Sequence, residues 1–259
     1  MLFHGSEHVV TRGYEDVFRA QGLTSVEDVL RAWCPEPPDP KRRSRVRELR
    51  VEGRHWFLKT YDYAGPWRLR TVFVPARVKR EYRNLISLAR LGLRVPQPIA
   101  YGQIRRYGFV TASFVITEAV EGAIDLRELA DGKPAPFPPP PRKERRVLLG
   151  TFAHQLRRCH DAGWFLYTAF FKNLLLTHEP EGYAIHVIDV PFAHIWRTRL
   201  LPGLARVRDL ACLQQGARRL LSRTQRLRFY KTYAGITNLE ARDKALLRRV
   251  DAYQRKHYP

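Results

Sequence analysis

The sequence predicts an α+β fold in two lobes, a small β-rich N-terminal lobe over residues 1–122 and a mostly helical C-terminal lobe over residues 123–259. Alternating apolar and charged residues are concentrated in the first part of the chain, whereas apolar residues at helical spacing dominate the second part. Between the two patterns lies KPAPFPPPPRKERR, residues 133–146, whose consecutive prolines join neither a helix nor a central strand. We therefore expect residues 133–141 to form a loop.

The first lobe is predicted to contain four strands and a helix. Residues 44–53 alternate apolar and charged side chains, and residues 54–61 follow a Glu-Gly turn, a pattern typical of a β-hairpin. Residues 75–93 place apolar side chains near helical spacing between a proline and a glycine, which predicts a helix. Residues 99–110 and 111–122 predict two more strands. The order is strand, strand, helix, strand, strand.

The second lobe is predicted to be helical apart from one hairpin. Residues 145–163 have the apolar spacing of a helix with one buried face, ended by a glycine. Residues 174–190 predict two strands around a Pro-Glu-Gly turn. Three further helices are expected at residues 207–221, 224–235 and 241–258, and the last of them is amphipathic and basic.

The formal net charge of +21 is extreme for 259 residues, and arginine clusters such as residues 41–50 and 142–146 spread it along the chain. Such an excess indicates an anionic partner, either an anionic lipid surface, including a phosphorylated glycolipid, or nucleic acid. Nucleic acid is the weaker alternative, because no recognised nucleic-acid-binding motif accompanies the charge. An arginine-rich source organism would explain the charge without any partner.

Composition otherwise indicates a folded protein of a reducing compartment. Cys34, Cys159 and Cys212 are widely spaced and odd in number, so neither a disulfide framework nor a zinc site is supported. The N-terminus lacks the basic start and apolar core of a signal peptide, and the longest mainly apolar run, residues 109–120, is too short and too polar to span a bilayer. We expect a cytoplasmic protein, with peripheral contact to a membrane face as an option.

Four polar residues occur in the order that a phosphoryl-transfer site requires. Such a site needs a strand lysine to hold nucleotide phosphates, a helix glutamate to orient that lysine, and carboxylate and amide oxygens for Mg²⁺. Lys59 lies in the second predicted strand, and Glu81 lies on the predicted helix that follows. Asn173 follows an apolar turn, and Asp189 follows an apolar strand. These residues predict a site for ATP and Mg²⁺.

Each of these residues alone has a simpler explanation. Lys59 could be a solvated strand lysine, Glu81 a surface glutamate and Asp189 a turn former at the end of a strand. The prediction depends on all four residues occurring in the right order, on the expected elements and at compatible spacings.

A series of phrases carries a family resemblance: GLTSVEDVLRAW, RSRVRELRVEGRHWFLKTY, VKREYRNLISLARLGLRVPQPIAYG, FVITEAVEG, CHDAG, VIDVPFAHI, VRDLACL and LRFYKTYAG. In this order they resemble the bacterial lipopolysaccharide kinase family, the WaaP/InaA-like group related to Kdo and heptose kinases, over roughly residues 20–235. The resemblance implies a protein-kinase-like bilobal fold, ATP with Mg²⁺, and phosphorylation of a lipopolysaccharide core sugar at the inner face of the cytoplasmic membrane. We also expect Glu118 and Val120, both in FVITEAVEG, to bind the nucleotide.

The chain departs from the kinase pattern at the catalytic loop. Kinases carry H-R-D-x-x-x-x-N, and counting back five positions from Asn173 gives Thr168, so Leu-Tyr-Thr occupies the place of the H-R-D triplet. His160 and Asp161 lie too far from Asn173 to supply the missing acid, and we interpret them as polar residues at a helix end. The turn before the second strand also offers a single glycine where protein kinases use three.

The missing aspartate leaves two hypotheses. Thr168 can hydrogen-bond a substrate hydroxyl but cannot act as an anionic base, which indicates a kinase with impaired or atypical catalysis. Alternatively, the protein is a pseudokinase that uses its fold and basic surface to bind an envelope-synthesis enzyme or anionic lipid head groups. Asp209 either holds the catalytic-loop backbone, as in kinases, or is a carboxylate near a helix start, favoured by the helix dipole.

Overall fold

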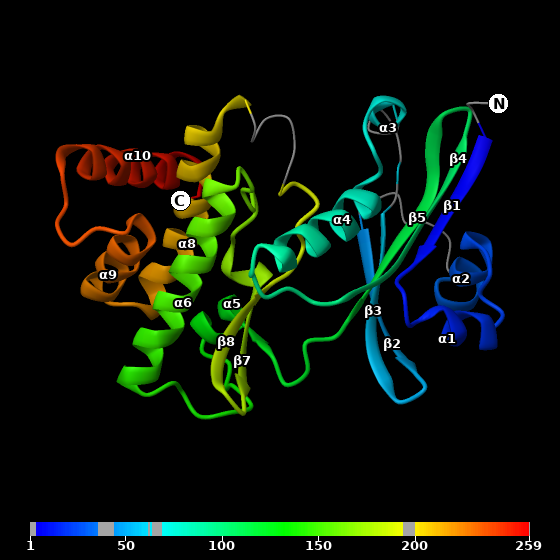
Figure 1. The fold of residues 1–259 in the computed structure, drawn as a ribbon, viewed down its shortest axis with the longest axis horizontal. Coiled ribbons are helices and arrows are strands. Elements are labelled where there is room, and N and C mark those ends of the chain that lie inside the picture. Colours follow the sequence, from blue (N-terminus) through cyan, green and yellow to red (C-terminus); the bar gives the residue numbers. More distant parts are fainter. Residues whose placement is uncertain (1–3, 36–43, 62, 64–68, 194–199, 259) are drawn as a thin grey trace. The chain divides into compact units, whose positions relative to one another are not determined.

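The computed structural model describes residues 4–35, 44–61, 63, 69–193 and 200–258 (Figure 1). The chain divides into two compact units, of which the first comprises Met1–Ile86 and Pro96–Ala119 and the second comprises Ser87–Val95 and Val120–Pro259. The first unit is built on an antiparallel sheet and the second is mostly helical, so the predicted α+β class is confirmed. The lobe ranges 1–122 and 123–259 stay a prediction.

The sheet of the first unit has five strands in the order β1-β4-β5-β3-β2, and all neighbours are antiparallel. The strands are β1 (His4–Val10), β2 (Ser44–Val51), β3 (Arg54–Tyr61), β4 (Pro98–Arg106) and β5 (Phe109–Glu118). The predicted hairpin is present as β2 and β3, joined at Glu52 and Gly53, which have φ values of 51° and 75°. Positive φ at both turn residues matches the right-handed twist of the strands, which explains the tight register of this hairpin. Strand β1 was not predicted.

The two faces of this sheet bury different clusters. On one face, Trp56, Leu58 and Phe114 are fully buried with residues of α1 (Glu15–Ala20) and α2 (Val26–Trp33). Gly102 in β4 permits this close packing, because a Cβ there would lie 2.5 Å from the Phe114 ring. A second cluster includes Tyr61, Tyr82 and Val115 and brings α4 (Arg77–Arg90) against the sheet; the short α3 (Arg70–Phe73) precedes it.

A polar cluster ties α4 to the edge strand β1. The Glu7 carboxylate accepts hydrogen bonds from Lys79 Nζ at 2.6 Å, from Tyr101 Oη at 2.6 Å and from Gln103 Nε2 at 2.7 Å. Burial acts to raise the pKa of Glu7, but these hydrogen bonds and the Lys79 charge outweigh it, so the pKa lies below its ordinary value. Helix α4 therefore has a fixed position on the sheet.

The second unit contains helices around a small sheet in the order β6-β7-β8. Its elements are β6 (Ile124–Asp125), α5 (Leu126–Ala130), α6 (Arg142–Asp161), the 3-10 turn η2 (Phe171–Asn173), β7 (Leu174–Glu179), β8 (Gly182–Val187), α8 (Pro202–Leu220), α9 (Arg223–Ala234) and α10 (Ala241–His257). The predicted hairpin and the four predicted helices are present, whereas β6 and α5 were not predicted. Gly216 of α8 touches η2 closely, because a Cβ there would lie 2.2 Å from the Phe171 ring.

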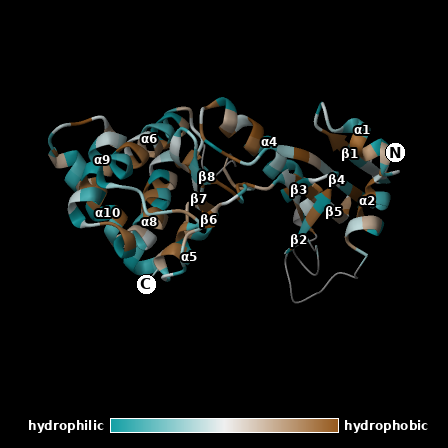
Figure 2. Cartoon of the chain, turned by 90° about the horizontal axis from the view of Figure 1, so that it is seen from below, coloured by the Kyte–Doolittle hydropathy of each residue, from teal (hydrophilic) through white to brown (hydrophobic). Residues whose placement is uncertain are grey.

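Burial also explains the chemistry of the cysteines. Cys159 and Cys212 are fully buried, and burial raises the pKa of each thiol to about 12, so both remain protonated at neutral pH. Figure 2 shows hydrophobic residues along β3 and β5, while α10 is largely hydrophilic. Within the described residues, no helix is both long and apolar enough to cross a membrane.

Candidate active site

Strand β3 and helix α4 bring Lys59 and Glu81 together in the first unit. Lys59 Nζ lies 3.3 Å from both carboxylate oxygens of Glu81, and Tyr61 Oη donates to the same carboxylate at 2.8 Å. The period of two in a strand places Lys59 and Tyr61 on one face of β3, opposite the buried Trp56 and Leu58. The structure therefore brings together the two charged residues that the sequence pairs.

The Lys59–Glu81 pair is almost removed from solvent. The exposed fractions of the two side chains are 16% and 6%. Burying two charges is unfavourable unless good geometry and further hydrogen bonds compensate, so such a pair contributes a defined arrangement more than stability. Tyr61 supplies a further hydrogen bond, and Glu81 thereby holds the lysine ammonium in one place. An oriented ammonium group is suited to bind phosphate oxygens.

In the second unit, Thr168, Asn173 and Asp189 form a chain of hydrogen bonds. Asn173 Nδ2 donates to the Thr168 carbonyl oxygen at 2.8 Å, and Thr168 Oγ1 donates to the Asp189 carbonyl oxygen at 3.0 Å. The Ile188 amide in turn donates to the Asn173 carbonyl oxygen at 2.9 Å. These contacts draw together the three positions that the sequence assigned to catalysis and to metal binding.

Asp189 occupies a strained backbone conformation. Its φ is 56°, in the left-handed region that residues other than glycine adopt rarely. Such residues concentrate at functional sites, because the surrounding structure must hold them against a cost of about 1–3 kcal/mol. The Thr168 hydroxyl on its carbonyl oxygen is one of the contacts that hold it. Asp189 is two residues beyond the end of β8, close to the predicted strand end.

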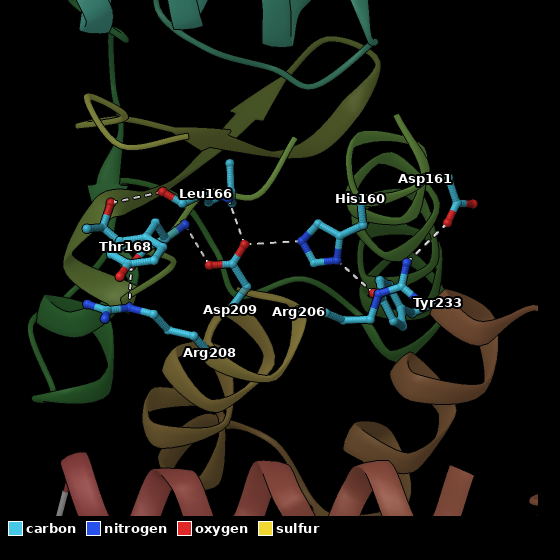
Figure 3. A network of polar contacts seen from close by, with 9 residues as sticks. His160, Asp161, Leu166, Thr168, Arg206, Arg208, Asp209 and Tyr233 are labelled. Carbon is cyan, nitrogen blue, oxygen red and sulfur yellow. Dashed lines mark hydrogen bonds and ion pairs between the residues drawn. The ribbon is translucent and has the colours of Figure 1, made fainter. Parts of the chain in front are cut away.

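Asp209 of α8 forms hydrogen bonds with the backbone of the loop that contains Thr168 (Figure 3). The fully buried Asp209 carboxylate accepts from the Leu166 amide at 2.7 Å and from the Tyr167 amide at 2.6 Å. Of the two interpretations of Asp209, the one in which it holds the loop backbone is therefore correct. Charge-assisted hydrogen bonds of this kind are stronger than neutral ones, so the loop shape is firmly set.

His160 lies at the end of α6, as the sequence indicated, but its buried contacts were not predicted. It is a buried residue, and its Nε2 lies 3.1 Å from Asp209 Oδ2 and its Nδ1 lies 2.7 Å from Tyr233 Oη (Figure 3). Because a carboxylate only accepts, Nε2 donates to Asp209, and in the neutral imidazole Nδ1 then accepts from the Tyr233 hydroxyl. The signal in the sequence was its spacing from Leu156 and Phe152, which lie four and eight residues earlier on the buried face of α6.

Asp161, in contrast, is the polar residue at a helix end that the sequence predicted. It is the last residue of α6, it is exposed, and Arg157 Nε lies 3.2 Å from its carboxylate. Arg206 Nη2 lies 3.4 Å from the same group (Figure 3). Within the described residues, the hydrogen bonds of His160 and Asp161 go to Asp209, Tyr233 and two arginines and not to Thr168; that neither residue replaces the missing acid stays a prediction.

Arg208 was missed by the sequence analysis. Its guanidinium carbon lies 3.9 Å from the centroid of the Tyr167 ring, and its Nε donates to the Tyr167 carbonyl oxygen at 3.0 Å (Figure 3). Tyr167 also has a left-handed backbone, with φ of 65°. Stacking on an aromatic face and donation to a carbonyl are both typical of arginine. Arg208 therefore supports the residue immediately before Thr168.

Glu118 and Val120 lie at the chain segment where the first unit passes to the second. Glu118 ends β5, and its Oε1 accepts from Tyr14 Oη at 2.7 Å. Burial and this hydrogen bond raise the pKa of Tyr14 to about 12. Val120 is partly buried and begins the main part of the second unit. The nucleotide-binding role of both residues stays a prediction.

The donor set of the second unit suits Mg²⁺ with a bound phosphate. Among the described residues, no group of three or more His, Cys, Asp and Glu side chains lies close enough to hold a metal ion. Mg²⁺ does not need such a cage, since it often takes one or two protein oxygens together with water and phosphate oxygens. The Asp189 carboxylate and the amide oxygen of Asn173 are ligands of that type, and Asn173 is buried and oriented through its Nδ2.

A comparison with known families decides where this chain belongs. The sequence profile of the lipopolysaccharide kinase (Kdo/WaaP) family matches residues 40–233, most of the chain. The chain belongs to the lipopolysaccharide kinase family. Membership confirms the family resemblance that the sequence phrases indicated.

The chain is also similar to individual proteins of known sequence or structure. The chain is 28% identical over 200 residues to the lipopolysaccharide core heptose(I) kinase WaaP of Pseudomonas aeruginosa, which covers 73% of each protein. A solved structure titled WaaP in complex with acyl carrier protein superposes with a TM-score of 0.70 at 24% identity, covering 98% of this chain and 100% of that one. The PknI kinase domain of Mycobacterium tuberculosis gives a TM-score of 0.42 at 16% identity, over 76% and 70% of the two chains. The predicted kinase-like α+β fold is confirmed by the WaaP structure.

Proposed function

We propose that this member of the lipopolysaccharide kinase family binds Mg-ATP and transfers phosphate slowly to a sugar of the lipopolysaccharide core. The observation that carries the proposal is the nearly buried Lys59–Glu81 pair, with Nζ 3.3 Å from the carboxylate. A buried ion pair adds little stability, so a nearly buried lysine held by a glutamate that also accepts from a tyrosine supports a role in binding an anion.

In this proposal, each residue has a defined task. Bound Mg-ATP supplies the phosphoryl group and a cation that neutralises charge developing on the phosphate oxygens. Lys59 holds phosphate oxygens, and Glu81 keeps its ammonium in position. Asn173 and Asp189 offer amide and carboxylate oxygens to the cation. Positioning and electrostatics supply most of the catalysis of phosphoryl transfer, and these residues provide both.

Transfer is expected to be slow because Thr168 lacks an anionic oxygen. A positioned general base contributes typically about 10²- to 10⁴-fold to a rate, and a neutral hydroxyl does not supply that contribution. Thr168 Oγ1 also donates to the Asp189 carbonyl oxygen at 3.0 Å, so its own proton is already engaged. The acceptor hydroxyl would then lose its proton to water or to the phosphate itself.

The second candidate function is that of a pseudokinase, which binds without transfer. The hydrogen bond from the Thr168 hydroxyl to the Asp189 carbonyl oxygen favours it, because this contact gives the residue at the place of the missing base a structural role. A pseudokinase would bind lipopolysaccharide core, anionic lipid head groups or an envelope-synthesis enzyme through its +21 charge. Acyl carrier protein is a protein partner to test first, since the WaaP relative was solved in complex with it.

One experiment separates the two candidates. The purified chain is incubated with Mg-ATP and purified core lipopolysaccharide, and both ATP hydrolysis and phosphate transfer to the core are measured. Transfer above the level of a Lys59→Ala variant supports the slow kinase. Binding of Mg-ATP by calorimetry without transfer to any core sugar supports the pseudokinase. Absence of both binding and transfer would reject the nucleotide site itself.

A further inference from the structure

A cavity of the second unit lies apart from the candidate active site. It has a volume of about 690 Å³ and is lined by the first half of α6, from Arg142 to Gly150, and by one side of α9, from its N-cap Ser222 to Thr232. Four arginines line it, Arg142, Arg145, Arg146 and Arg228, together with the hydroxyl groups of Ser222 and Thr224. None of the described residues that line it is acidic. The arginine cluster at residues 142–146, noted in the sequence, therefore lines a concave site.

The two helices that form the cavity run in the same direction. Phe152 of α6 and Phe229 of α9 have ring centroids 6.2 Å apart, and further along both helices His160 Nδ1 lies 2.7 Å from Tyr233 Oη. The N-terminal ends of α6 and α9 therefore lie at the same end of the pair, and the cavity extends from there along α9 to Thr232. A helix N-terminus carries a partial positive charge, which here adds to that of the arginines.

The positive charge of the cavity is not neutralised by the described part of the chain. No ion pair among the described residues involves Arg142, Arg146 or Arg228, and Arg145 Nη2 donates to the Pro140 carbonyl oxygen at 3.0 Å. Elsewhere in the same unit, arginines do have acidic partners, as Arg219 has Asp131 at 2.6 Å. A concave surface with like charges and no counter-charge attracts and concentrates anions.

We propose that this cavity binds a ligand that carries two or more phosphate groups. Guanidinium groups match phosphate oxygens with paired hydrogen bonds, and four of them exceed what one phosphate needs. The volume of about 690 Å³ falls within the range of about 300–1,000 Å³ of ligand pockets, so it can hold more than a single phosphate. The Ser222 and Thr224 hydroxyls supply neutral donors beside the arginines.

This site is independent of the proposed nucleotide site. None of Lys59, Glu81, Thr168, Asn173 or Asp189 lines it. Two sources present the same phosphate chemistry, a soluble phosphate ester and the head group of a phosphorylated lipid, and the experiment distinguishes them.

The binding of inorganic pyrophosphate is measured by calorimetry at low salt. The chain carries Lys59→Ala, so that pyrophosphate at the nucleotide site does not contribute. The test variant adds Arg146→Gln and Arg228→Gln, both exposed residues of the cavity, and the control adds Arg248→Gln and Arg249→Gln, both exposed on α10. The two variants lose the same charge from the same unit. We expect the test variant to bind pyrophosphate at least about tenfold more weakly and the control to change less than about twofold.

A second arm uses phosphatidylcholine vesicles with and without cardiolipin, whose head group carries two phosphates. If the source is a lipid head group, pyrophosphate displaces the chain from the cardiolipin vesicles, and the cavity variant binds them more weakly than the control. If the source is soluble, the two variants bind the vesicles equally while still differing toward pyrophosphate. Either result supports the site. Absence of pyrophosphate binding at millimolar concentration, or an equal loss in both variants with the fold intact by circular dichroism, would overturn it.

Discussion

The lysine–glutamate pair of the first unit has both of the charged groups that a phosphoryl-transfer site needs, whereas the Thr168 loop of the second unit lacks the catalytic aspartate. The pair keeps both charged groups, with Lys59 Nζ 3.3 Å from Glu81. The loop keeps its supports, since Asp209 accepts from the amide of Tyr167 and Asn173 donates to the carbonyl of Thr168, but the side chain at 168 is a hydroxyl. Both supports bind backbone atoms, so these two supports do not depend on the side chain at position 168. The loop can therefore keep its main anchors without the charge that catalysis needs.

The largest expected effect comes from removing the support of the loop. Asp209→Ala leaves the buried amides of Leu166 and Tyr167 and the ring of His160 without their acceptor. Breaking a buried charged network typically costs about 3–5 kcal/mol, and we expect the free energy of unfolding in urea to fall by that amount. Asp161→Ala, at the exposed end of α6, is the control and should cost less than about 1 kcal/mol.

Asp209→Asn refines this test if the alanine variant does not fold. Asparagine keeps one oxygen acceptor but loses the charge, so its loss of stability should fall between those of the control and of alanine. An asparagine variant as stable as the natural chain would mean that the carboxylate charge adds nothing to the loop.

The second prediction restores the charge that the loop lacks. Thr168→Asp places an anionic acceptor where a sugar hydroxyl must lose its proton, and transfer to core lipopolysaccharide should rise toward about 10²-fold, the lower end of the range for a positioned base. The gain stays at the lower end because the aspartate oxygens would face the Asp189 carbonyl oxygen that Thr168 now donates to. Initial rates of phosphate transfer measure it.

Asn173→Ala in the Thr168→Asp background controls for this gain. It removes the donor to the carbonyl at position 168 and the amide oxygen offered to Mg²⁺, so the gain should disappear. An unchanged rate in Thr168→Asp on every core sugar, with Mg-ATP still bound and the fold intact, would favour the pseudokinase.

The sequence predicted the elements and side-chain positions that depend on residues close together in the chain. The β2–β3 hairpin follows from the alternation of apolar and charged residues on both sides of Glu52 and Gly53. The same alternation determines on which face of β3 Lys59 lies. The contacts of His160 were not predicted because its partners Asp209 and Tyr233 are 49 and 73 residues away in the chain. Strand β1 was missed for a similar reason, since it pairs with β4 nearly a hundred residues later. Contacts this distant follow from the packing of whole elements, which local spacing does not encode.

The third prediction tests the Lys59–Glu81 pair, which the sequence predicted and the structure brings together. Mg-ATP should raise the melting temperature of the chain, because a ligand that binds only the native state stabilises it. Lys59→Ala removes the ammonium group that would bind the phosphate oxygens and should weaken Mg-ATP binding at least about tenfold. Arg83 is an exposed residue on the same helix as Glu81, and Arg83→Ala should leave Mg-ATP binding unchanged. Equal affinity of the Lys59→Ala and Arg83→Ala variants in calorimetry would exclude the nucleotide role of the pair.

The smallest expected effect concerns Glu7, which holds α4 and therefore Glu81 in place. Its carboxylate accepts from Lys79, Tyr101 and Gln103, and Glu7→Gln exchanges charge-assisted hydrogen bonds for neutral ones. Because the group is partly exposed, with 32% of its side chain accessible, we expect a loss of only about 1 kcal/mol in the free energy of unfolding at neutral pH. Glu27→Gln, an exposed residue in the first turn of α2, is the matched control.

The contribution of Glu7 to the free energy of unfolding should depend on pH, and the direction of its pKa shift determines how. The folded-state pKa of Glu7 lies below its ordinary value of 4.5, so the folded chain favours the ionised form. The stabilisation is therefore complete above pH 4.5 and is lost as the pH falls through the lowered folded-state pKa. Below that point both the natural chain and Glu7→Gln carry a neutral group, and their urea midpoints should converge. A difference that persists undiminished at pH values well below 4.5 would mean that shape, and not the charge of Glu7, anchors α4 to the sheet.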